Sequence, residues 1–156
     1  MKRSIGLLLL SYCLIESTPR IPQTTGKIDP VLGVFDGRTP CQDLAKQLNE
    51  KVIPECTKIK WRLVLYVDSI SGNATTYSLL GFIYKKDNPR VGRWHTIKGT
   101  KANPEAIVYQ LDQAGGPSLF LQKGGNNVLF FLDQERNLMV GDRYLSYTLN
   151  RTSAVP

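Results

Sequence analysis

From residue 60 to residue 150 the sequence is a succession of short segments in which apolar and polar residues alternate, with Gly, Asn and Asp between them. In the first segment Trp61, Leu63, Leu65 and Val67 share one face, which is the two-residue period of a half-buried strand. Strands are predicted at 60–67, 75–84, 93–99, 106–111, 118–123, 128–132, 138–140 and 144–150. No helical spacer separates them. About eight short strands at such regular spacing predict an all-β fold, a small antiparallel meander closed into a barrel.

The apolar faces of these strands carry bulky residues. A small barrel either fills its interior with side chains or holds one small ligand. The residues expected to point inward are Trp61, Leu63, Leu65, Tyr77, Leu79, Trp94, Phe130 and Leu132. Bulky residues in that number favour a filled barrel over a hollow one.

One short N-terminal helix is predicted before the strands. Thr39-Pro40-Cys41-Gln42 fits a capping box, with Thr39 as N-cap and Pro40 at the first helical position. The helical period then places one apolar stripe on Cys41, Leu44, Ala45, Leu48 and Val52. Pro54 is expected to end the helix.

The chain divides into three parts. Residues 1–16 read as an export signal, because Lys2 and Arg3 precede an apolar stretch at 5–15 that is too short to span a bilayer. Residues 17–32 are rich in Pro and polar residues and predict a flexible tether. Residues 33–156 suit one compact barrel domain.

The end of the export signal leaves two routes open. Leu10-Ser11-Tyr12-Cys13 resembles a bacterial lipobox, in which Cys13 would be lipidated and would tether the protein to a membrane. The position before that cysteine is normally small, and here it is Tyr12. Simple secretion is therefore the alternative.

Basic residues are concentrated between residues 85 and 101. The formal net charge of the chain is +7 at pH 7. In this stretch Asp87 is the acid facing six basic residues, namely Lys85, Lys86, Arg90, Arg93, Lys98 and Lys101. In an exported protein such an excess favours a partner surface or anionic lipid headgroups and cell-wall polymers, and not nucleic acid. A solvated hairpin with basic residues on its exposed face is the alternative.

Little in the sequence points to catalysis or to metal binding. A nucleophile needs a base beside it, and the single histidine, His95, follows Trp94 in a predicted strand. If Trp94 points inward, His95 points outward into solvent. Structural zinc takes four Cys or His ligands, and the exported part offers three. We therefore expect no enzymatic activity, no cofactor and no metal site.

Cys41 and Cys56 remain once Cys13 of the leader is set aside. An exported chain lies in an oxidising compartment, where an even number of cysteines favours a disulfide. A reversible redox switch and a site for a soft metal ion are the other roles open to this pair.

The segment 34–44, Val-Phe-Asp-Gly-Arg-Thr-Pro-Cys-Gln-Asp-Leu, resembles the aromatic-x-G-x-x-P-C-x-D-C start of the N-terminal domain of NlpE-like envelope lipoproteins. Four shorter segments match in the same order. They are T-Y-x-L at 76–79, G-x-W at 92–94, L-D-x-x-x-N-L at 132–138 and Y-T-L at 147–149. The resemblance spans residues 33–151 and implies a lipocalin-like barrel in the bacterial envelope.

Members of this family are associated with copper tolerance, surface adhesion and signalling of envelope stress, and are not known as enzymes. The chain departs from them at Leu44, which stands in place of the second cysteine of the C-x-x-C motif credited with metal or redox sensing. We predict a non-enzymatic module, in the periplasm, anchored at the outer membrane or secreted, that binds an envelope protein or reports envelope, copper or surface stress. A carrier of a small apolar or lipid ligand is the alternative.

Overall fold

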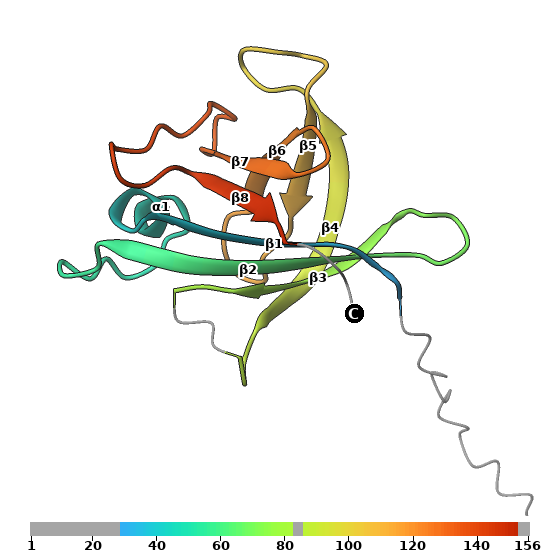
Figure 1. Ribbon diagram of the computed structural model, residues 1–156, viewed down its shortest axis with the longest axis horizontal. Helices are drawn as coiled ribbons and strands as arrows, with labels where there is room; N and C mark the ends of the chain where they lie inside the picture. The colour runs from blue at the N-terminus through green and yellow to red at the C-terminus, as the bar shows by residue number, and fades with distance from the viewer. Residues whose placement is uncertain (1–28, 83–85, 153–156) are drawn as a thin grey trace, which may run out of the picture.

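The computed structural model describes residues 29–82 and 86–152 and confirms the predicted fold. The strands form a closed antiparallel barrel in which each strand pairs with its neighbours in sequence and β8 returns to β1 (Figure 1). The elements are β1 Val31–Pro40, α1 Gln42–Gln47, β2 Lys58–Val67, β3 Ala74–Leu80, β4 Arg90–Lys98, β5 Ile107–Leu111, β6 Leu119–Gly124, β7 Val128–Leu132 and β8 Thr148–Arg151. None of the helices in the described residues is long and apolar enough to cross a membrane.

The barrel has one strand more at its start, and one fewer near its end, than the alternation predicts. β1 begins at Val31, inside the stretch expected to be a tether, and pairs with β2 as far as Pro40. Its Asp, Gly and Pro residues are poor strand formers, so pairing on both sides, and not local propensity, makes it a strand. The expected strand at 138–140 is reduced to an isolated bridge between Leu138 and Leu132.

The barrel interior is filled with side chains. Of the residues expected to point inward, all but Phe130 are buried. In β7 Leu129, Phe131 and Leu132 are buried, but Leu129 and Phe131 are the ones that pack in the core of the barrel. Phe130 lies on the outer face above Gly124, where a Cβ atom would stand 2.2 Å from its ring. The expected register of β7 was therefore wrong by one residue, which moves a side chain to the other face.

The helix α1 closes the end of the barrel at which β1 finishes and β2 begins (Figure 1). Leu44, Ala45 and Leu48 are buried there, as the apolar stripe predicts. The helix ends much earlier than expected, because Asn49 adopts a left-handed conformation with φ of 54°. The Asn49 and Glu50 amides donate to the carbonyls of Lys46 and Ala45, which is a Schellman closure.

The predicted capping box is wrong. The N-cap position is Cys41, and no side chain caps the helix. Thr39 belongs to β1 and is fully buried, where its Oγ1 accepts a hydrogen bond of 2.9 Å from Nε1 of Trp61. Gln42 turns away from the helix start and donates to the carbonyls of Ile53 and Cys56 at 2.9 and 3.0 Å.

The disulfide between Cys41 and Cys56 is present, with 5.8 Å between the two Cα atoms. It joins the start of α1 to the segment that leads into β2. Together with the Gln42 hydrogen bonds it holds the segment 50–57, which has no regular secondary structure, against the helix.

Candidate functional site

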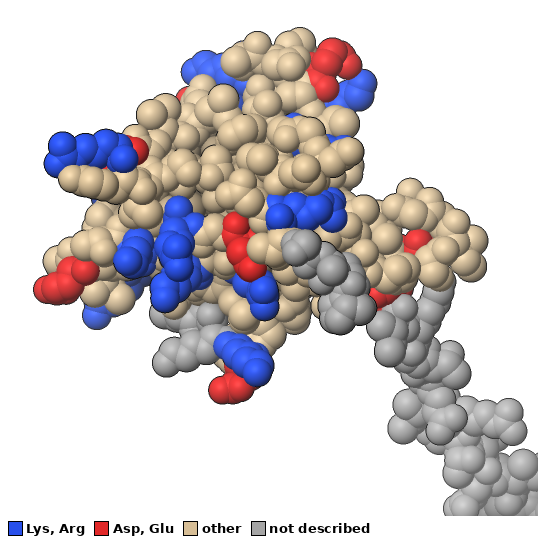
Figure 2. All heavy atoms as spheres, viewed as in Figure 1, with Lys and Arg blue, Asp and Glu red and all other residues tan. Residues whose placement is uncertain are grey.

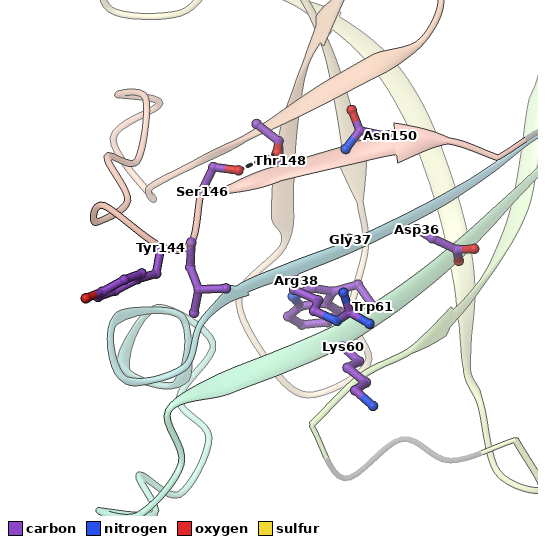
Figure 3. Close-up of a pocket in the computed structure, with 10 residues that line it drawn as sticks. Asp36, Gly37, Arg38, Lys60, Trp61, Tyr144, Ser146, Thr148 and Asn150 are labelled. Carbon is purple, nitrogen blue, oxygen red and sulfur yellow. Dashed lines mark hydrogen bonds between the residues drawn. The ribbon is translucent and has the colours of Figure 1, made fainter.

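The outer surface of the barrel opens where β1 and β8 separate. Their ladder contains two pairs, Phe35 with Arg151 and Asp36 with Asn150. Beyond Asp36, β1 continues alongside β2, while the chain before β8 turns away. We call the resulting hollow of about 580 Å3 the polar cleft (Figure 3). Its lining residues are Asp36, Gly37, Arg38, Lys60, Trp61, Tyr144, Leu145, Ser146, Thr148 and Asn150.

Gly37 allows the two walls of the polar cleft to approach at its closed end. A Cβ atom at this position would lie 2.4 Å from the main-chain oxygen of Thr148. Trp61 lies opposite Gly37 in the β1–β2 ladder and forms part of the floor. Because its indole is 3% exposed and is hydrogen-bonded to Thr39, this floor is fixed in place.

Arg38 and Lys60 give the polar cleft its positive charge. They are direct cross-strand partners in the β1–β2 ladder, and like charges placed opposite each other destabilise a sheet. Within the described residues neither side chain has a hydrogen bond or an ion pair. The neighbouring carboxylate of Asp36 is already engaged, since Arg62 donates to both of its oxygens at 2.9 Å. Figure 2 shows basic side chains gathered over β1 and β2.

The opposite wall carries hydrogen-bonding groups and an exposed aromatic ring. Ser146 and Thr148 share a hydroxyl–hydroxyl bond of 2.7 Å (Figure 3). The Tyr144 ring is 76% exposed, and the guanidinium of Arg143 lies 4.6 Å from its centre. Asp142 fixes this wall by accepting the amides of Tyr144 and Leu145. This arrangement suits binding of an anionic group that also forms hydrogen bonds.

A second hollow, which we call the apolar cleft, opens where β3 leaves β2. The β2–β3 ladder ends at the pair Arg62–Leu80, and the segment 50–56 lies beside the gap. Phe82 packs edge-on against Trp61 at 5.4 Å and forms one wall. The volume is about 430 Å3, and the lining residues are Cys41, Glu50, Lys51, Ile53, Cys56, Lys58, Ile59, Lys60, Leu80, Gly81 and Phe82.

The basic residues singled out in the sequence do not gather into one patch. Lys85 lies outside the described residues. Arg90 and Lys98 stand at opposite ends of β4, which at 3.3 Å per residue is roughly 26 Å. Lys86 and Arg93 are exposed.

Acids from outside the stretch 85–101 lie beside three of these basic residues. Arg90 approaches Glu50 at 3.9 Å, Lys98 binds Glu105 at 2.9 Å and Lys101 lies 3.6 Å from Glu135. The stretch itself contains Asp87, and the fold adds Glu50, Glu105 and Glu135 from outside it. The net positive charge around these side chains is correspondingly smaller than the sequence suggests.

His95 points outward on the face opposite to Trp94, as predicted. Its Nε2 lies 2.7 Å from Oδ2 of Asp112, and Gln110 and Ser118 also donate to that carboxylate. Burial raises the pKa of Asp112, but these hydrogen bonds outweigh it and hold the pKa below its ordinary value. Ser118 contacts Asp112 and not His95, so this group lacks the order of a nucleophilic triad.

The described residues contain no group of three or more His, Cys, Asp or Glu side chains that could hold a metal ion. Cys13 and the predicted export signal at 1–16 lie outside the described residues. Sequence reasoning missed both clefts, because their walls come from β1, β2, the segment 50–56 and the chain around β8, which folding alone brings together.

Comparisons with protein families, with characterised proteins and with solved structures found no match to this chain. The NlpE-like resemblance stays a prediction.

Proposed function

We propose that this chain is a non-enzymatic, NlpE-like module of the bacterial cell envelope that binds an acidic, extended segment of an envelope protein in the polar cleft. The observation that carries the proposal is the pair Arg38–Lys60, two opposed cations without a counter-ion in the described residues. An acidic partner would remove the repulsion between them and gain a charge-assisted contact with each.

The main chain of β1 supports an extended partner. The Thr152 amide donates to the Val34 carbonyl at 2.9 Å, so Val34 turns its main-chain groups toward β8. Because these groups alternate in direction along a strand, those of Asp36 and Arg38 face the same side. The ladder with β8 ends at Asp36, which leaves the Arg38 amide and carbonyl facing the polar cleft. A partner strand can add there by main-chain hydrogen bonds.

The disulfide supports an envelope location, because such bonds persist in oxidising compartments. It also bears on the copper role of the resembling family. With Cys41 and Cys56 bonded to each other, neither is a free thiolate for a soft ion in this state. We therefore propose that occupancy of the polar cleft, and not copper binding at the cysteines, is what this module reports.

The test of partner binding is a calorimetric titration with a synthetic extended peptide in which Glu and Thr alternate. The double variant Arg38→Ala/Lys60→Ala is expected to bind at least roughly tenfold more weakly than the wild type. The matched control Lys98→Ala/Lys101→Ala removes the same charge and is expected to bind like the wild type. Equal loss in both variants, or in neither, would contradict the proposal.

The test of the envelope location is metabolic labelling with a radioactive fatty acid in a bacterial host. Lipid anchoring through Cys13 predicts label in the wild type and none in Cys13→Ala. Export without a lipid predicts unlabelled protein that is released with the periplasmic fraction. Protein that stays in the cytoplasm with both cysteines of the barrel reduced would overturn the location.

One observation favours a second function, that of a carrier for a small apolar ligand. The barrel interior carries bulky buried side chains, whereas the apolar cleft has a size within the range of about 300–1,000 Å3 that is typical of small-molecule sites. A carrier function would therefore use the outside of the barrel end and not its interior.

A further inference from the structure

We infer that the apolar cleft binds one long-chain fatty acid, with its chain along the apolar wall and its carboxylate among the lysines at the rim. The inference deepens the second function proposed above and rests on it. It assigns a ligand class and the residues that recognise each end of the ligand.

The wall of the cleft offers a surface that a hydrocarbon chain would remove from water. Ile59 is buried at the base, and Leu80 and Phe82 are half-buried. Ile53 is 50% exposed although its carbonyl is held by Gln42. The main chain is therefore held while the side chain presents an apolar surface to water, and covering such a surface favours binding.

The fold holds this wall in shape without a ligand. The disulfide and the Gln42 hydrogen bonds fix the segment 50–56 on one side. On the other side Phe82 takes a left-handed conformation, with φ of 49°, and packs its ring against Trp61. A preformed site loses less conformational entropy on binding than one that has to be ordered by its ligand.

The rim supplies charge that is complementary to a fatty acid. Lys51 and Lys58 are exposed, and within the described residues neither has an ion pair. The acid of the rim, Glu50, approaches Arg90 at 3.9 Å. Lysine ammonium groups act as point charges that pair with an anionic head group. A volume of about 430 Å3 is small for a lipid with two chains. These features together favour a lipid with a single chain and an anionic head group, and a fatty acid is the simplest ligand of that class.

The binding test uses the oxidised full chain and a fatty acid that carries an environment-sensitive dye at its methyl end. Saturable binding and displacement by the unlabelled fatty acid are expected. Ile53→Glu is expected to weaken binding at least roughly tenfold, because a carboxylate then stands in the apolar wall. The matched control is Ile70→Glu, at a turn residue that is 89% exposed and distant in the sequence, and it is expected to bind like the wild type. Absence of saturable binding, or equal loss in both variants, would overturn the inference.

Recognition of the head group is tested with a pair of ligands, the fatty acid and its methyl ester. This test does not depend on whether the Ile53→Glu variant folds. Lys51→Ala/Lys58→Ala is expected to weaken binding of the fatty acid while leaving that of its methyl ester unchanged. Tighter displacement by a phosphate-headed lysolipid than by the fatty acid would overturn the carboxylate assignment. These variants leave Arg38 and Lys60 intact, so this test and the acidic-peptide titration can fail independently.

Discussion

At the scale of single residues, Thr39 and Trp61 show how a tertiary contact replaces a local one. The sequence around Thr39 fits a helix N-cap, in which a hydroxyl accepts a nearby amide. In the fold the same hydroxyl lies in a strand and accepts the indole N–H of Trp61, so both polar groups are satisfied inside the barrel. Local pattern alone does not reveal a partner that lies 22 positions away.

Thr39→Val tests this hydrogen bond, because it keeps the shape of the side chain and removes the acceptor. The Trp61 N–H would then be buried without a partner, which costs about 1–3 kcal/mol. We expect a loss of that size in the free energy of unfolding, measured by urea denaturation. Thr39→Ser retains the hydroxyl and serves as the control. Equal stability of Thr39→Val and wild type would show that the bond is unimportant.

Tyr77 gives the molecule a dependence on alkaline pH. Burial raises its pKa to about 12, whereas an unfolded tyrosine titrates near about 10. A raised folded-state pKa contributes stability that is complete below pH of about 10 and is lost as pH rises toward about 12. We expect Tyr77→Phe, followed by denaturation at each pH, to show a shallower decline across this window. An identical decline in both proteins would assign the effect to other groups.

At the scale of elements, the apolar stripe predicted the buried face of the helix α1 correctly, whereas both ends of the helix were predicted wrongly. Leu44 and Leu48 are spaced one turn apart and are both buried, so the period was informative. The helix terminus depended on Asn49, whose left-handed conformation stops the helix well before Pro54. β1 escaped notice because Gly37 and Pro40 weaken its strand pattern, although two neighbouring strands hold it.

The disulfide is expected to stabilise this end of the barrel without being needed for the barrel itself. Its sequence separation is 15 residues, and a loop of that length corresponds to about 3 kcal/mol in the chain-entropy model. Cys41→Ala/Cys56→Ala should lose about that much in chemical denaturation while keeping the far-ultraviolet spectrum of a β-protein. Reductant should lower the stability of the wild type and leave the double variant unchanged. A double variant as stable as oxidised wild type would contradict a stabilising role for the disulfide.

At the scale of the whole molecule, alternation predicted the barrel because most strands are amphipathic and consecutive strands pair. It could not predict where the closed barrel would open. The polar cleft exists because β8 pairs with β1 at two positions, and this pairing is set by how the barrel closes. The surface charge near the end of β4 also depends on folding, since the acid beside Lys101 is Glu135, which is distant in the sequence.

Amide hydrogen exchange tests most directly whether a partner binds at the main chain of Arg38. Exchange would be followed residue by residue, with and without the alternating Glu–Thr peptide at saturation. Pairing of a partner strand with β1 predicts that the Arg38 amide exchanges more slowly in the complex, while the outward-facing residues of β4 keep their rates. Saturating peptide that leaves the Arg38 amide unchanged would contradict strand addition in the polar cleft.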